Sequence, residues 1–366
     1  MKILKYKLRE TILVAVVVAI ALAASFANEN FLTLNNLSNI FHTMSTPGIM
    51  AIGMTLIIAT GNIDISIGAL FYTICVISAK LCIAFNGEYG LLIMLVGIVV
   101  GTLIGFINGI LVAKLRIPAI VVTLATMNAI RGITLVIIDG AIITGLTGKF
   151  VKIAAIKLGP LFISPFIWLI LFGLAYIMLY HTTVGRKILA VGDNPVAAAR
   201  VGISNERIYI LVFTIAGFLA GIAGPLYTSK IGTINTVVGL GYEMKLIAAA
   251  VIGGTAFSGG TASLFGTFCG IAIVGFTENM LVMMQVPTYW QQTTTGAILL
   301  VAVVSSAFQF RLTIKASDSN KNNGNGIGNG NGIRNGVCNG IGNDNDNNNK
   351  DKDKIECTGK GVSESD

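Results

Sequence analysis

Long apolar stretches separated by short polar segments dominate the chain from residue 11 to residue 310. A helix that crosses the hydrocarbon layer of a membrane needs about 20 predominantly apolar residues. The pattern therefore predicts an all-α membrane protein with about ten transmembrane passes, two of them short or broken. The predicted passes are Thr11–Ala27, Pro47–Thr60, Ile65–Phe85, Leu91–Ala113, Pro118–Ile138, Phe162–Tyr180, Ile208–Tyr227, Leu246–Ile252, Ser263–Met284 and Thr293–Phe310.

Composition supports this class and divides the chain into parts. Of the 366 residues, 54% are apolar and only 11% are charged, against roughly 25% charged in an ordinary soluble domain. Residues 317–366 differ, because they are rich in Asn, Gly and charged side chains and cannot bury enough apolar surface to fold. We expect a cytoplasmic N-terminus at 1–10, a transmembrane domain at 11–310 and a disordered cytoplasmic tail at 317–366.

Basic residues set the expected orientation, because cytoplasmic loops of membrane proteins carry an excess of Lys and Arg. With ten passes, both termini lie in the cytoplasm of a multi-pass plasma (inner) membrane protein. The net charge of +8 is then a topology signal and not a nucleic-acid footprint. The alternative for the first pass is a cleaved secretory signal ending near Ala21-Leu22-Ala23. The basic residues placed inside are Lys2, Lys5, Lys7, Arg9, Lys114, Arg116, Arg186, Lys187, Arg200, Arg207, Arg311 and Lys315, against Lys149, Lys152, Lys157 and Lys230 outside.

Two polar or glycine-rich segments interrupt the apolar pattern, at 59–68 and at 252–261. In the first, Asp64 and Ser66 are good N-cap residues for the helix that follows. An acid at membrane depth must face protein or water, so this break either lines a cavity or is a plain turn with Asp64 as its cap. The glycines of the second break indicate either a transport path or close helix packing.

Other polar residues at membrane depth complete the candidate translocation path. Asn108 and Asn128 are alternatively hydrogen-bond partners between helices, and Arg131 is expected to snorkel. Glu278 either pairs across the fold or meets water. The candidate path residues are Asn62, Asp64, Ser66, Asn108, Asn128, Gly253, Gly254, Ser258, Glu278 and Asn279.

The polar loop at 182–207 contains the signals of one short helix at 194–201. Asn194 suits the N-cap, Pro195 suits the first helical position, and Gly202 suits a left-handed stop. Such a helix has only about two turns and is marginal alone. We therefore expect it to pack against the bundle or against another protein.

Several ordered motifs give the chain a specific resemblance to a known family. The segment GDNPVAAARVG at 192–202 resembles the coupling-loop signature of sugar-type ABC importer permeases. The similarity extends through ATGNIDISIG at 59–68 and through the segments at 117–136, 241–267 and 286–303. Asn62 and Lys245 depart from the family pattern, which usually has Gly and an acid there. The stretch from Asp139 to Gly145 is most similar to that of ribose permeases.

The resemblance implies a subunit that carries a monosaccharide, ribose above all, across the membrane. It implies as partners a second permease chain, like or unlike, a cytoplasmic ABC ATPase that uses ATP, and an extracytoplasmic sugar-binding protein. The resemblance puts the ATPase-coupling role on Gly192, Asp193, Asn194, Ala197, Ala198 and Gly202.

The residues themselves show no phosphate loop, no metal-ligand spacing and no catalytic group set. We expect a non-catalytic chain that binds no cofactor and no metal, with ATP used by its partner. The rival hypothesis is an autonomous secondary carrier or channel with Asp64, Glu243 and Glu278 as ion ligands. A membrane-embedded enzyme is the third and weakest hypothesis.

Overall fold

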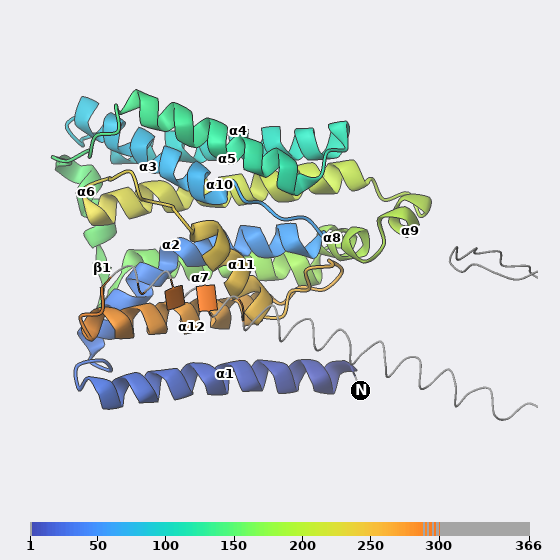
Figure 1. Cartoon of the computed structure of the whole chain (residues 1–366), viewed down its shortest axis with the longest axis horizontal. Helices are drawn as coiled ribbons and strands as arrows, with labels where there is room; N and C mark the ends of the chain where they lie inside the picture. Colours follow the sequence, from blue (N-terminus) through green and yellow to red (C-terminus); the bar gives the residue numbers. More distant parts are fainter. Residues whose placement is uncertain (1, 288–289, 291–292, 295, 298–299, 301–366) are drawn as a thin grey trace, which may run out of the picture. The chain divides into compact units, whose positions relative to one another are not determined.

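A bundle of helices makes up the computed structural model, which describes residues 2–287, 290, 293–294, 296–297 and 300 (Figure 1). Its one two-stranded sheet in that part of the chain is an antiparallel hairpin that pairs Lys157 with Phe162 and Leu158 with Leu161. The predicted tail at 317–366 lies outside the described residues. The elements are α1 (Lys2–Ala27), α2 (Leu34–Ala59), α3 (Ile67–Ala84), α4 (Gly90–Leu115), α5 (Ala119–Ile137), α6 (Gly148–Ala155), β1 (Lys157–Leu158), β2 (Leu161–Phe162), α7 (Ile163–His181), α8 (Thr183–Asp193), α9 (Pro195–Arg200), α10 (Asn205–Ile231), α11 (Tyr242–Ile252) and α12 (Leu264–Met283).

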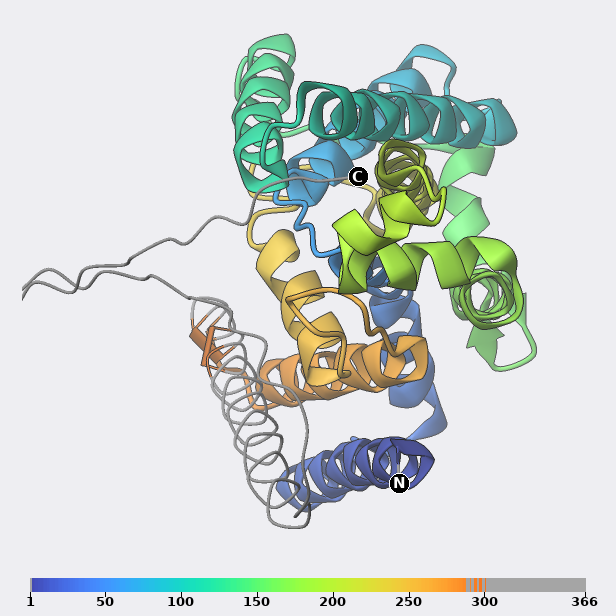
Figure 2. The same cartoon turned by 90° about the vertical axis from the view of Figure 1, so that its right-hand side faces the viewer.

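The long helices run between two ends of the bundle, seen at the right and left of Figure 1. We call the right-hand end, where α8 and α9 lie, the α8 end, and the opposite end the α6 end. Figure 2 views the bundle from the α8 end.

The outer surface of the bundle is apolar, as a protein surrounded by lipid requires. Leu91, Val99 and Val136 are 74%, 63% and 77% exposed. In the described part, seven helices are long and apolar enough to cross a membrane: α2, α3, α4, α5, α7, α10 and α12. The predicted all-α membrane fold is confirmed. The count of ten passes stays a prediction, since most of Thr293–Phe310 lies outside the described residues.

The expected short pass at Pro47–Thr60 is wrong, because it is the second half of α2, a helix of 26 residues. Polar residues before Pro47 hid the first half of this helix from a reading based on hydropathy. Two of those residues bond within the helix: the hydroxyls of Thr43 and Ser45 donate to the carbonyl oxygens of Asn39 and Phe41. Pro47 is tolerated inside α2, whose second half is buried on all sides.

Glycines bring α4 and α10 into direct backbone contact. Gly97, Gly101 and Gly105 recur every fourth residue on α4 and are buried. A Cβ on Gly101 would lie 2.4 Å from the Gly217 carbonyl oxygen, and a Cβ on Gly217 would lie 2.2 Å from the Gly101 carbonyl oxygen. Small residues at this spacing allow helices in lipid to pack closely. This pair forms the rigid frame of the bundle.

A short helix is present where the second short pass, Leu246–Ile252, was expected: α11 has 11 residues and extends only about 16 Å. It lies in the middle of the bundle, and the loop from 232 to 241 leads to its start (Figure 1). The first turns of α3 and α11 touch there: a Cβ on Gly68 would lie 2.5 Å from Glu243 Oε2 and 2.5 Å from the Gly239 carbonyl oxygen. Two interrupted helices therefore meet inside the bundle.

Replacing Gly217 with Ala tests the α4–α10 frame. The added methyl overlaps the Gly101 carbonyl, so we expect Gly217→Ala to lower the free energy of unfolding by about 1–3 kcal/mol. The control is Gly173→Ala on α7, where an added Cβ meets nothing within 4 Å. Thermal unfolding of the two variants in the same detergent measures the difference, and equal midpoints would contradict the close packing.

Candidate functional site

Three segments far apart in the sequence meet at the α8 end. The Gly260 amide, in the second break, donates to the Ala59 carbonyl at the end of α2, over 3.0 Å. Gly192, near the end of α8, packs against both: a Cβ there would lie 1.9 Å from the Ala59 oxygen and 2.5 Å from the Gly260 nitrogen. Both breaks and the predicted coupling loop therefore touch through bare backbone.

The loop of the second break can make this contact only with glycine. Gly259 and Gly260 have φ angles of +81° and +78°, in the left-handed region that disfavours side chains. A Cβ on Gly259 would lie 2.7 Å from the Gly192 carbonyl oxygen and 2.7 Å from the Gly61 nitrogen. Close packing, one of the two alternatives for these glycines, is thus what the structure shows here.

The predicted coupling helix is present as α9. The Asn194 side chain caps it by accepting from the Ala197 amide over 2.9 Å, Pro195 occupies its first position, and Gly202 has φ +83°. The helix α8, which precedes α9, was not predicted. The amphipathic pattern of residues 183–193 within the polar loop could have indicated it.

The residues of α9 differ widely in their exposure. Ala198 is only 4% exposed and packs toward the bundle, whereas Val196 and Val201 are 62% and 75% exposed. Asp193 and Ala197 are also exposed. Ala198 therefore belongs to the buried side of α9, while both valines are exposed.

The residues of the first break form a buried hydrogen-bond network. Asp64 Oδ1 accepts from the amide of Ser66 over 2.8 Å and from its hydroxyl over 2.6 Å. Asn108 of α4 donates to the Ser66 hydroxyl over 3.0 Å, and Thr126 of α5 donates to Asn108 Oδ1 over 2.8 Å. Asp64 thus holds Ser66, the N-cap residue of α3, and Asn108 links α4 to the first break and to α5.

The other candidate path residues are dispersed. Asn62 donates to the Thr60 hydroxyl within the first break, and Asn128 is exposed on α5 and donates to its own helix at Leu124. Gly253 packs against the backbone of Gly266 on α12. Gly254 has φ +104° in the second break, and Ser258 is exposed there.

Glu278 and Asn279 lie apart from these, toward the α6 end of α12. Glu278 forms an ion pair with Lys245 of α11, so its partner comes from across the fold. Asn279 and Asn36 of α2 exchange amide hydrogen bonds of 3.0 Å and 3.3 Å. The sequence showed Lys245 as a departure from the family pattern but did not indicate that it pairs with Glu278.

Arg131 does not snorkel. Its guanidinium donates to the Thr236 carbonyl over 2.7 Å and lies 4.9 Å from the centre of the Tyr72 ring. It thereby fixes the loop from 232 to 241, which leads to α11. Nothing in the sequence indicated this long-range contact.

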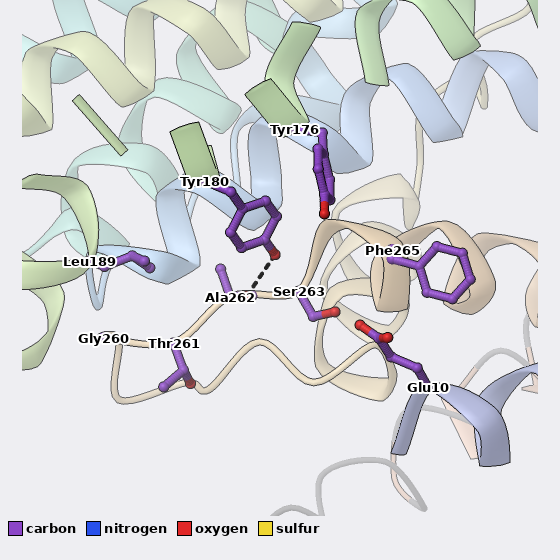
Figure 3. Close-up of a pocket in the computed structure, with 9 residues that line it drawn as sticks. All are labelled: Glu10, Tyr176, Tyr180, Leu189, Gly260, Thr261, Ala262, Ser263 and Phe265. Atoms are coloured by element: carbon purple, nitrogen blue, oxygen red, sulfur yellow. Dashed lines mark hydrogen bonds between the residues drawn. The ribbon is translucent and has the colours of Figure 1, made fainter. Parts of the chain in front are cut away.

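A cavity of about 510 Å³ adjoins the contact at the α8 end (Figure 3). Tyr176 and Tyr180 of α7 line one side, and Glu10 of α1 lies opposite, near Ser263. The Tyr180 hydroxyl donates to the Ala262 carbonyl over 3.1 Å, which ties the loop of the second break to α7. Among the described residues, no group of His, Cys, Asp or Glu is arranged to hold a metal ion.

Comparison with known proteins identifies the family. Residues 36–303 match the family model described as branched-chain amino acid transport system / permease component. The chain belongs to this permease family. No solved structure matches the chain.

The permease is similar over most of its length to curated relatives. It is 34% identical to the ribose import permease protein RbsC of Haemophilus influenzae over 83% of this chain and 94% of the relative. It is 36% identical to RbsC of Escherichia coli over 80% and 91%. Identity to the autoinducer 2 import system permease protein LsrC of Yersinia pseudotuberculosis is 35% over 80% and 83%. The resemblance found in the sequence is confirmed.

Replacing Gly192 with Ala tests the three-segment contact. The methyl would push α8 away from the Ala59 carbonyl, so we expect the Gly260 amide to exchange with deuterium at least about tenfold faster. This corresponds to a local opening free energy lower by about 1.4 kcal/mol. Hydrogen exchange measured by mass spectrometry reports this. Gly173→Ala is again the control, and unchanged protection at Gly260 would show that Gly192 is not required for the contact.

Proposed function

We propose that this permease is the membrane subunit of an ATP-driven importer of ribose in the bacterial plasma (inner) membrane. A second permease chain, a cytoplasmic ABC ATPase and an extracytoplasmic sugar-binding protein complete the importer. ATP binds the ATPase, and this chain is non-catalytic and carries no cofactor. The observation that supports the proposal most is the 34–36% identity to ribose import permeases over nearly their whole length.

The α8 end faces the cytoplasm in this proposal. Lys114, Arg186 and Arg207 lie at or beside this end, as expected for loops retained inside the cell. The start of α1 is then cytoplasmic, a last pass at Thr293–Phe310 would return the chain to the same side, and the sugar-binding protein docks at the α6 end. The second permease chain covers the exposed face of α5, where Asn128 is a lone amide among exposed apolar residues.

Coupling to the ATPase would pass through α9 and α8. The exposed Val196 and Val201 provide apolar contact for a partner, and α9 is joined directly to α8. Because Gly192 touches both breaks, a displacement of α8 is transmitted to α2 and to the loop before α12. The hydrogen bond from Asn205 Nδ2, at the start of α10, to the Pro195 carbonyl, 2.9 Å, ties α9 to α10 as well.

Reconstitution tests the function and its substrate. Vesicles that hold the chain, its ATPase and its binding protein should accumulate D-ribose only with ATP present. Preference for autoinducer 2 over D-ribose under the same conditions would overturn the assigned sugar. Uptake by this chain alone, driven by an ion gradient, would instead support an autonomous carrier.

Charge placed on the exposed face of α9 should break the coupling. We expect Val196→Asp to reduce co-purification with the ATPase at least about tenfold, because a carboxylate would be desolvated at an apolar contact. Pull-down and ATP-dependent ribose uptake measure the loss. The control is Ile156→Asp, an equally drastic change at a 46% exposed residue at the α6 end. Undiminished pairing in Val196→Asp would exclude α9 as the docking surface.

A further inference from the structure

A cavity of about 240 Å³ lies within the single chain, between α2, α11 and α12. Its polar lining consists of the Lys245–Glu278 ion pair, Asn279 and Thr43. Its apolar lining includes Ile40, Met44, Pro47, Ile271 and Val282. We call it the charge-pair cavity. It is separate from the cavity at the α8 end, which shares none of these residues.

The short helix α11 accounts for the position of the cavity. α11 extends about 16 Å, while the hydrocarbon core of a membrane is about 30 Å thick, so the helix leaves part of that depth unfilled. Lys245 lies in the first turns of α11, and Glu278 lies about 21 Å along α12 from its start at the α8 end. The ion pair therefore lies toward the α6 end.

A charged pair at this depth is costly and marks a polar pathway more often than a structural need. Lys245 and Glu278 are not sealed off: their side chains are 13% and 25% exposed. An ammonium has three donors and a carboxylate about four acceptor sites, so the bond between them leaves most of this capacity available. A nearby cation, Lys230, donates to the Thr43 hydroxyl over 2.7 Å.

The lining matches a small polyhydroxylated molecule. A volume of about 240 Å³ is large enough to hold a monosaccharide. Adjacent hydroxyls can accept from Lys245 and donate to Glu278, while the C–H face of the ring contacts Met44 and Ile271. A neutral polyol also disturbs the ion pair less than a charged solute would.

We propose that the charge-pair cavity is a monosaccharide-binding site within each permease chain, with Lys245, Glu278, Asn279 and Thr43 as its polar contacts. This proposal rests on the proposed function as a sugar importer. The site holds one sugar with its hydroxyls on the ion pair. Because the pair stays bonded to itself when the site is empty, binding is weak enough to allow release.

Protection of an introduced cysteine tests the site directly. Val282 lines the cavity and is 56% exposed, so the thiol of Val282→Cys should react with N-ethylmaleimide in the purified full chain in nanodiscs. We expect saturating D-ribose to slow this reaction at least about threefold. The matched control is Val201→Cys at the end of α9, 75% exposed and outside the cavity, which D-ribose should not protect. Mass spectrometry of the labelled peptides separates these sites from the native cysteines.

The role of the Lys245–Glu278 ion pair is tested by a second substitution in the Val282→Cys chain. Glu278→Gln replaces a charge-assisted acceptor by a neutral one, so we expect the D-ribose concentration for half protection to rise about tenfold. The control is Glu88→Gln, which removes the charge from an exposed pair with Lys149, 2.7 Å away, at the α6 end. Val282→Phe should block the cavity without touching the pair, and should raise the KM for D-ribose uptake about tenfold relative to Val99→Phe.

The outcomes separate this site from the function as a whole. Equal protection of both cysteines, or protection by the same concentration of trimethylglycine, would overturn the site, because trimethylglycine has no hydroxyls. Absence of protection in a chain whose complete importer moves D-ribose would also overturn the site and leave the function standing. Protection without ATP-dependent uptake would support the site and count against the importer.

Discussion

Bare backbone contact at Gly192 is the constraint on which the rest of the permease depends. The Ala59 carbonyl, the Gly260 amide and Gly192 approach one another with no side chain between them. The atoms in this contact cannot move closer together, because they are already at van der Waals or hydrogen-bond distance. The end of α2, the second break and α8 must therefore shift together or separate completely, which is the behaviour required of a mechanical joint.

The packing elsewhere determines which parts can move. Gly101 and Gly217 clamp α4 to α10, and the network from Ser66 through Asn108 to Thr126 ties the first break to this frame. On the other side, α11 is clamped to α12: a Cβ on Gly270 would lie 2.2 Å from the Ala249 carbonyl oxygen. In the described part of the chain, α4–α10 and α11–α12 are therefore two closely packed helix pairs, and α2 packs against both.

The sequence predicted what depends on neighbouring residues and missed what depends on distant ones. Asn194, Pro195 and Gly202 predicted α9 because caps act within a few residues. Hydropathy did not indicate the first half of α2, where polar side chains such as Thr43 and Ser45 bond to their own helix. The pairing of Lys245 with Glu278, the anchoring of Thr236 by Arg131 and the meeting of both breaks at Gly192 link segments far apart in the chain. Spacing in the sequence carries no information about such contacts.

The joint at Gly192 and the charge-pair cavity are connected through the same helices. The cavity has α2 as one wall and the α11–α12 pair as the other, and the joint binds the end of α2 to the loop between α11 and α12. The Thr55 and Thr267 hydroxyls, 2.8 Å apart, join the two walls between these levels. A displacement of α8 that separates Ala59 from Gly260 would tilt the walls about this point and reshape the cavity. Because Lys245 and Glu278 belong to the same wall, their ion pair would survive the motion, so the sugar would lose its apolar contacts with α2 while no charge is left unpaired in the membrane.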